Sequence, residues 1–124
     1  MPLEYEELTK VIIAAAIEVH RRLGPGFLES IYENALVIEL KKRNVSVKQQ
    51  FEVIINYDEI EIGRHRIDLF VDKTIVVELK AIKNIENIHF AIVKSYLRAL
   101  NMTHGLILNF NKEKLEIKRV IVTH

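Results

Sequence analysis

Two segments near the start of the chain have apolar residues at every third or fourth position, a spacing that predicts amphipathic helices. In residues 3–23 the inward stripe would consist of Leu8, Val11, Ile12, Ala15, Val19 and Leu23. The corner Leu23-Gly24-Pro25-Gly26 ends this helix, because Pro25 lacks the amide donor that a continuing helix needs. A second helix is expected from Leu28 to Arg43, with an inward face of Ile31, Tyr32, Ala35, Leu36 and Leu40.

After Asn44 the apolar period falls to two, which is typical of half-buried strands. Strands are predicted at residues 51–57, 60–71, 75–80, 105–110 and 115–122. Gly63 would mark a bulge in the second of them. A helix over residues 85–100, facing inward through Ile88, Ile92, Tyr96 and Ala99, would connect the third strand to the fourth. The order predicts an α/β fold of mixed α+β type, with a mixed sheet flanked by helices.

The loop between the second and third strands decides which side chains share a face of the sheet. A two-residue loop would place Asp68 and Glu78 on opposite sides, whereas a three-residue loop over residues 72–74 would pair Val71 with Ile75 and Asp68 with Glu78. We favour the longer loop because it gathers one wholly apolar face, made of Ile67, Leu69, Val71, Ile75, Val77 and Leu79. The opposite face would then hold Arg66, Asp68, Glu78 and Lys80.

Two carboxylates opposite each other on neighbouring strands repel unless a cation lies between them. Oxygen ligands select Mg²⁺, Mn²⁺ or Ca²⁺, and Mg²⁺ typically binds one or two protein carboxylates. Lys80 could hold a water molecule beside such an ion, and the set would suit metal-assisted hydrolysis of a phosphodiester. The alternative is a surface network in which Lys80 and Arg66 neutralise Asp68 and Glu78.

Composition and charge limit the classes of protein to which this chain can belong. The chain has 124 residues, the length of one ordinary domain, so we expect a single domain over residues 1–124. Its 18 Lys and Arg nearly balance 17 Asp and Glu, so any affinity for nucleic acid would come from a local patch. The absence of Cys excludes disulfides, thiolate zinc sites and a thiol nucleophile. Without a long apolar run or a basic leader, we expect a soluble, cytoplasmic protein with no membrane contact.

Several basic residues could follow the phosphates of a nucleic acid. They are Arg21, Arg22, Arg64 and Arg66, although each is also typical of solvated surface. His89 is a further candidate for contact with nucleic acid, although we favour a helix-surface or capping role for it.

Segments spread over most of the chain resemble a known superfamily. Asp68 followed by Glu78-Leu79-Lys80 resembles the Asp…Glu-x-Lys signature of the PD-(D/E)XK nuclease superfamily. The segment Gly26-Phe27-Leu28-Glu29-Ser30-Ile31-Tyr32 is similar to the motif of the GxxExxY family, a set of small proteins assigned to that superfamily. The likeness extends to residues 18–26, to Tyr96-Leu97 and to residues 105–110.

The resemblance implies a restriction-endonuclease-like core in the order α-β-β-β-α-β, with an extra N-terminal helix and an extra C-terminal strand. It also implies that Asp68, Glu78 and the backbone carbonyl of Leu79 bind Mg²⁺ or Mn²⁺ and that Lys80 orients or activates water. Glu29 would bind the metal or hold its hydration shell; alternatively it is a first-turn acid that suits the helix dipole, with Tyr32 in the core.

The sequence departs from the family pattern at Ile92, where a glutamine often stands. Two hypotheses therefore remain open. The first is a metal-dependent nuclease that hydrolyses DNA or another nucleic acid, for which a homodimer would suit cutting both strands of a duplex. The second is a catalytically inactive module of nuclease fold that binds nucleic acid or a protein partner. A structural subunit of a larger complex is a third reading.

Overall fold

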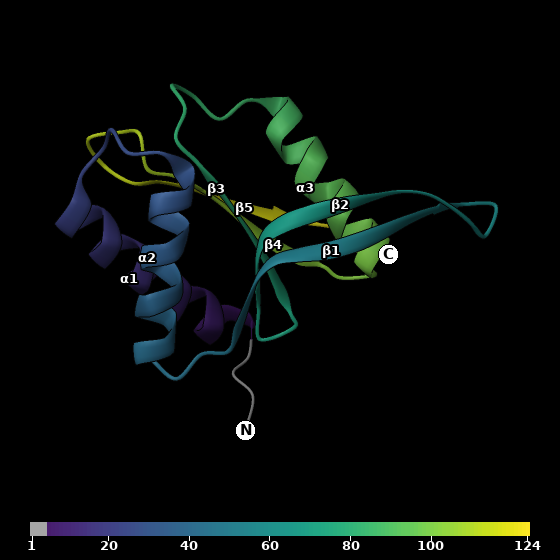
Figure 1. The fold of residues 1–124 in the computed structure, drawn as a ribbon, viewed down its shortest axis with the longest axis horizontal. Coiled ribbons are helices and arrows are strands. Elements are labelled where there is room, and N and C mark those ends of the chain that lie inside the picture. The colour runs from purple at the N-terminus through teal and green to yellow at the C-terminus, as the bar shows by residue number, and fades with distance from the viewer. Residues whose placement is uncertain (1–4) are drawn as a thin grey trace.

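A computed structural model of the protein describes residues 5–124, and its elements follow the predicted order (Figure 1). The helices are α1 (Tyr5–Leu23), α2 (Glu29–Lys42) and α3 (Asn87–Leu100). The strands are β1 (Val47–Tyr57), β2 (Ile60–Val71), β3 (Ile75–Lys80), β4 (His104–Asn109) and β5 (Glu116–Ile121). Residues 3 and 4 of the first predicted helix lie outside the described residues. The strand expected from residue 51 begins earlier, because residues 47–49 also pair with β2.

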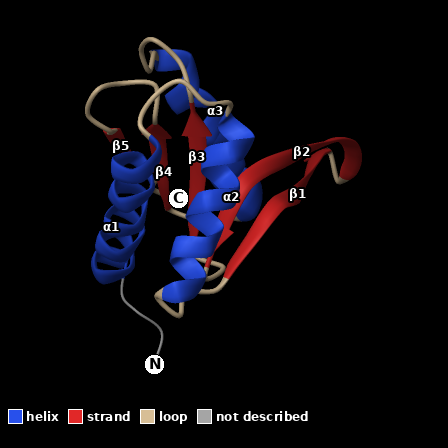
Figure 2. Ribbon diagram, turned by 60° about the vertical axis from the view of Figure 1, so that its left-hand side comes forward, coloured by secondary structure: helices blue, strands red, loops and turns tan. Residues whose placement is uncertain are grey.

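The strands form one mixed sheet in the order β1-β2-β3-β4-β5. Only the β3–β4 pair is parallel within the described part of the chain, and α3 forms the crossover between these two strands. Helices α1 and α2 pack on one face of the sheet and α3 on the other, each over its own apolar core (Figure 2). The predicted fold class, a mixed sheet flanked by helices, is confirmed.

The β2–β3 hairpin has the predicted register. Its loop spans residues 72–74, and Val71 pairs with Ile75, followed by Phe70 with Val76 and Leu69 with Val77. The residues of the predicted apolar face are all buried, and most of them pack under α1 and α2. Ile67 is the exception, because it belongs to the core under α3. The inside-outside alternation of β1 and β2 breaks near Gln50, which has a φ of 50°.

The buried faces of two helices differ from the predicted ones. In α2, Ile31 is 41% exposed, whereas the acids Glu33 and Glu39 are buried. Because the buried face of α2 carries these acids, the pattern of hydrophobic residues does not identify it as buried. In α3, Ile88, Ile92 and Ala99 are exposed, so that Tyr96 is the one predicted inward residue that is buried, together with Val93 and Leu97. Apolar residues lie on more than one side of α3, so its sequence pattern fits two orientations.

Strands β1 and β2 extend beyond the rest of the sheet as a two-stranded ribbon (Figure 1). Their register shifts between Ile55 and Asn56: Ile55 pairs with Gly63, and Asn56 pairs with Glu61. Ile62 is therefore left over beside Gly63, so the predicted bulge is confirmed. Within residues 5–124, no helix combines the length and the apolar character that crossing a membrane requires.

The close packing of α3 on β4 depends on Gly105. A Cβ at this position would lie 2.9 Å from Val93 Cγ1 and 3.4 Å from the carbonyl oxygen of Val76. We therefore expect Gly105→Ala to lower the free energy of unfolding by about 1–3 kcal/mol, as overpacking of a core does. Urea denaturation measures this change. Gly63→Ala is the control, since a Cβ there meets no atom within 4 Å; an equal loss in both variants would contradict the packing argument.

Candidate functional site

Asp68 and Glu78 meet where the β2–β3 ladder ends. Beyond the Leu69–Val77 pair, side-chain carboxylates accept hydrogen bonds from backbone amides of the neighbouring strand. The Asp68 amide donates to Glu78 Oε1 at 3.0 Å, and the Leu79 amide donates to Asp68 Oδ2 at 2.9 Å. The two acids therefore face each other, as the three-residue loop predicts, and each is fixed by the backbone that carries the other.

The burial of this pair changes its electrostatics. Glu78 is only 5% exposed, and its pKa is raised to about 8, first by burial and then by the neighbouring charge of Asp68. The hydrogen bond from the Asp68 amide and the charge of Lys80 act in the opposite direction but do not offset these effects. Burial and the charge of Asp68 therefore both favour the protonated form of Glu78, whereas a cation beside the two acids would favour its ionised form.

Lys80 is half-buried at the end of β3, two residues beyond Glu78 and so on the same face of the strand. Within residues 5–124, neither Lys80 nor Arg66 forms an ion pair with Asp68 or Glu78. The surface ion-pair network that was the alternative interpretation is therefore not present in this part of the chain.

The loop that follows Lys80 is fixed by a buried amide. The Asn109 side chain accepts a hydrogen bond from the Ile82 amide at 3.1 Å and donates to the Ile82 carbonyl at 2.9 Å. Asn109 has no solvent exposure, and its amide also donates to Glu116 at 3.0 Å. The strand end that carries Lys80 is consequently tied to both β4 and β5.

Glu33 of α2 is a third acid at this site, and the sequence reasoning missed it. Its carboxylate is buried and accepts hydrogen bonds of 2.8 Å from both Gln49 and Gln50. The same Gln50 amide nitrogen lies 3.4 Å from Asp68 Oδ1 and so bridges the two acids. Burial, with a further contribution from the charge of Asp68, raises the pKa of Glu33. One signal was available: Glu33 lies one helical turn after Glu29 and thus near the same face.

Glu29 is exposed in the first turn of α2. Its charge contributes to the raised pKa values of Glu33 and Glu78, so it lies near enough to influence the site. Tyr32, by contrast, is fully buried: its hydroxyl donates to the Gly24 carbonyl at 2.6 Å, and its ring stacks on Phe110 at 4.5 Å. The core role for Tyr32 is therefore confirmed.

Helix α3 contributes Tyr96 to the surroundings of the two acids. It is 8% exposed, and its pKa is raised by burial and then by the charges of Glu78 and Asp68. The ring of His65 lies 5.4 Å from the Tyr96 ring, centroid to centroid. His65 is exposed rather than in the apolar core.

The candidate phosphate contacts are divided between two elements, α1 and β2. Three of these arginines form ion pairs: Arg21 with Glu18 at 2.7 Å, Arg22 with Glu39 at 3.5 Å, and Arg64 with Glu52 at 2.6 Å. Arg66 is exposed and has no ion pair within residues 5–124.

His89 caps α3. Its Nδ1 accepts a hydrogen bond from the Glu86 amide at 2.8 Å, while the Glu86 side chain accepts one from the His89 amide. The capping interpretation is confirmed.

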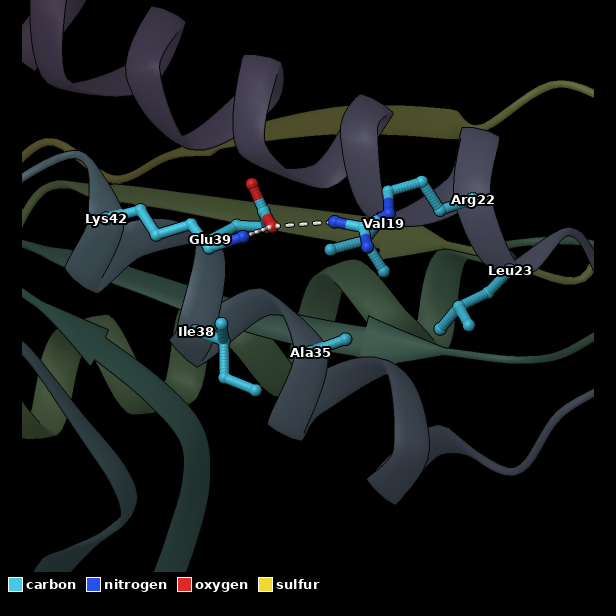
Figure 3. A pocket seen from close by; sticks show the side chains of 7 residues that line it. All are labelled: Val19, Arg22, Leu23, Ala35, Ile38, Glu39 and Lys42. Carbon is cyan, nitrogen blue, oxygen red and sulfur yellow. Dashed lines mark hydrogen bonds and ion pairs between the residues drawn. The ribbon is translucent and has the colours of Figure 1, made fainter.

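A separate groove of about 220 Å³ lies between α1 and α2 (Figure 3). Its apolar lining surrounds Glu39, which binds Arg22 of α1 and, at 3.1 Å, Lys42 of its own helix. Hydrogen bonds from Arg43 and Lys42 hold the pKa of Glu39 below its ordinary value. The Arg22–Glu39 ion pair joins the two helices, and the groove contains neither acid of the β2–β3 pair.

The donor set at Asp68 and Glu78 fits a hard divalent cation. Each carboxylate uses one oxygen for a backbone amide. Glu78 Oε2 is left to coordinate an ion, together with Asp68 Oδ1, whose contact with the Gln50 amide is long at 3.4 Å. Within residues 5–124, no three His, Cys, Asp or Glu side chains are close enough to form a cage. Two carboxylates with water in the other positions is an arrangement that Mg²⁺ commonly accepts, because it dehydrates reluctantly.

Comparisons with known proteins agree with this geometry. A family model described as the PD-(D/E)XK nuclease superfamily matches residues 6–120. The crystal structure of SSO0001 is similar over 97% of this chain, with a TM-score of 0.60 and 19% sequence identity, and the chain spans 60% of that protein. The family match and this structural likeness together support the predicted restriction-endonuclease-like fold. No curated protein matches the sequence.

The raised pKa of Glu78 predicts a pH-dependent stability in the absence of metal. Between the ordinary pKa of 4.5 and about 8, folded Glu78 retains a proton that the unfolded chain has lost. The free energy of unfolding should therefore fall as pH rises through this window and level off above it. Urea denaturation in EDTA at several pH values tests this. Glu78→Gln should reduce the fall, whereas Glu113→Gln, at an exposed position, should not; identical pH profiles for all three proteins would contradict the assignment.

Proposed function

The chain belongs to the PD-(D/E)XK nuclease superfamily, and we propose that it is a metal-dependent phosphodiesterase that cuts nucleic acid, most simply DNA. The observation that carries this proposal is the pair of buried Glu78 and half-buried Asp68, each acid oriented by a backbone amide of the opposite strand. Nucleases of this superfamily generally depend on a divalent metal. In this protein Asp68, Glu78 and the backbone carbonyl of Leu79 would hold Mg²⁺ or Mn²⁺.

The residues at the site would each have a different role in the reaction. Bound Mg²⁺ would stabilise charge on the phosphate oxygens and lower the pKa of a coordinated water molecule. Asp68 and Glu78 hold their free oxygens at fixed positions, since each carboxylate is restrained by a backbone amide. Lys80, which has no ion pair within the described residues, is free to hydrogen-bond the attacking water and to offset charge at the phosphate.

Glu33 is the helix acid that we assign to the site. It is buried and linked through Gln50 to Asp68, whereas Glu29 is exposed and acts mainly through its charge. In this assignment Glu33 orients water in the metal's hydration shell, and Glu29 adds to the field that attracts the cation. We also propose that the chain is a member of the GxxExxY family, a proposal that rests on Gly26, Glu29 and Tyr32.

Partners and organisation follow from the same proposal. Residues 1–124 would act as one domain, and a homodimer would provide two sites for the two strands of a duplex. Arg66, on the same strand as Asp68 and without an ion pair within residues 5–124, is the arginine best placed to meet a phosphate; Arg21, Arg22 and Arg64 are already paired with acids.

Removal of the site should abolish cleavage. We expect the wild-type protein to cut supercoiled, single-stranded or branched DNA in Mg²⁺ or Mn²⁺ and to lose this activity in EDTA. Asp68→Asn, Glu78→Gln and Lys80→Ala should each lower the rate by at least about 100-fold, because each removes charge stabilisation from the transition state. Gel assays of purified variants measure this loss. Lys118→Ala, at an exposed position on β5, is the matched control, and equal cutting by all variants would point to a contaminant.

Divalent ions should also stabilise the folded protein. At an ion concentration 100-fold above the dissociation constant, binding adds about 2.7 kcal/mol to the free energy of unfolding. Thermal melts with and without Mn²⁺ detect this gain, and Glu78→Gln should remove it. If Mn²⁺ neither stabilises the wild type nor supports cleavage, even with DNA present, the protein is an inactive binding module. Ile92, which stands where the family often has a glutamine, favours this second hypothesis.

The roles of Glu29 and Glu33 in α2 can be distinguished experimentally. Glu33→Gln should impair cleavage more strongly than Glu29→Gln, because only Glu33 is connected to Asp68 by hydrogen bonds. Cleavage rates over a range of Mn²⁺ concentrations provide the comparison, and Glu7→Gln in α1 serves as an exposed-acid control. A greater loss in Glu29→Gln would reverse the assignment.

A further inference from the structure

An open cleft of about 530 Å³ lies between the β1–β2 ribbon and α3. The ribbon contributes Ile55, Asn56 and His65 to its lining, and α3 contributes Ser95, Arg98 and Ala99. We call it the ribbon cleft. Its volume is within the range of small-molecule sites in proteins.

Two aromatic rings relate the ribbon cleft to the carboxylate pair. The ring of His65, which lines the cleft, lies 5.4 Å from the ring of Tyr96, and the charges of Glu78 and Asp68 contribute to the raised pKa of Tyr96. Along β2, His65 precedes Asp68 by three residues, about 10 Å of extended strand. A nucleic-acid strand with its scissile phosphate at the acids would therefore pass the cleft with a neighbouring nucleotide.

The chemistry of the lining suits a nucleobase with its phosphate. The exposed ring of His65 offers a face for stacking, and Ile55 and Ala99 provide apolar walls. Asn56 supplies an amide, and Ser95, whose hydroxyl donates to the Ile92 carbonyl at 2.6 Å, keeps its oxygen as an acceptor.

The charge of the cleft lining also suits a phosphate. Arg98 carries the one formal charge of the cleft lining and has no ion pair within residues 5–124. No carboxylate contributes to the lining described, so nothing in it would repel a phosphate.

We propose that the ribbon cleft binds an unpaired base of the strand being cut, which makes single-stranded or locally unpaired nucleic acid the substrate class. This inference rests on the proposed nuclease function. A base within a duplex is stacked on its neighbours and must leave the helix to enter a lined cleft, whereas a base in a single strand enters without that cost.

Binding of a fluorescein-labelled oligothymidylate, followed by anisotropy in EDTA so that no cleavage occurs, tests the proposal. The wild-type protein should bind this single strand more tightly than a duplex of the same length. His65→Ala and Arg98→Ala should each weaken single-strand binding about tenfold. Arg119→Ala is the charge-matched control and should change binding little, because Arg119 is exposed and lies near α1, across the sheet from the cleft.

The outcomes separate this inference from the nuclease proposal. If the wild type cleaves DNA in Mg²⁺ but both cleft variants bind the oligothymidylate as the wild type does, the cleft assignment is overturned and the nuclease proposal stands. If both variants lose binding while the wild type never cleaves, the cleft assignment stands and the nuclease proposal falls. Equal affinity for single strand and duplex, or no binding by the wild type, overturns the substrate class.

Discussion

The interaction on which this structure depends is the mutual restraint of Asp68 and Glu78. Each carboxylate accepts a hydrogen bond from a backbone amide of the strand opposite its own, so the last bonds between β2 and β3 are made by side chains. This exchange brings two acids together in a half-buried position, where burial and repulsion raise the pKa of Glu78 to about 8. The fold thus holds two neighbouring acids whose full ionisation a divalent cation would stabilise.

The surrounding elements hold this arrangement from three sides. Helix α2 supplies Glu33, which Gln50 connects to Asp68, and the buried Asn109 fixes the loop after Lys80. On the other face of the sheet, the charges of both acids contribute to the raised pKa of the buried Tyr96, whose ring lies 5.4 Å from that of His65. These groups come from separate segments of the chain, so the geometry of the acids depends on how several elements pack together.

The two faces of the sheet have different roles. The face under α1 and α2 is an apolar core, and the Glu39 ion pairs join those two helices at its outer side (Figure 3). The face under α3 holds an apolar core, and there the protruding ribbon forms an open cleft with α3.

The sequence by itself determined the order of elements and the pairing of Asp68 with Glu78, because a period of two and a three-residue loop leave one register with an apolar face. It could not reveal Glu33 or the orientation of α3: the buried face of α2 carries acids, and the apolar residues of α3 fit two orientations. Only the tertiary structure decided which side chains from distant segments converge, since Gln50, Tyr96 and His65 approach the acids through packing, which local periodicity does not encode.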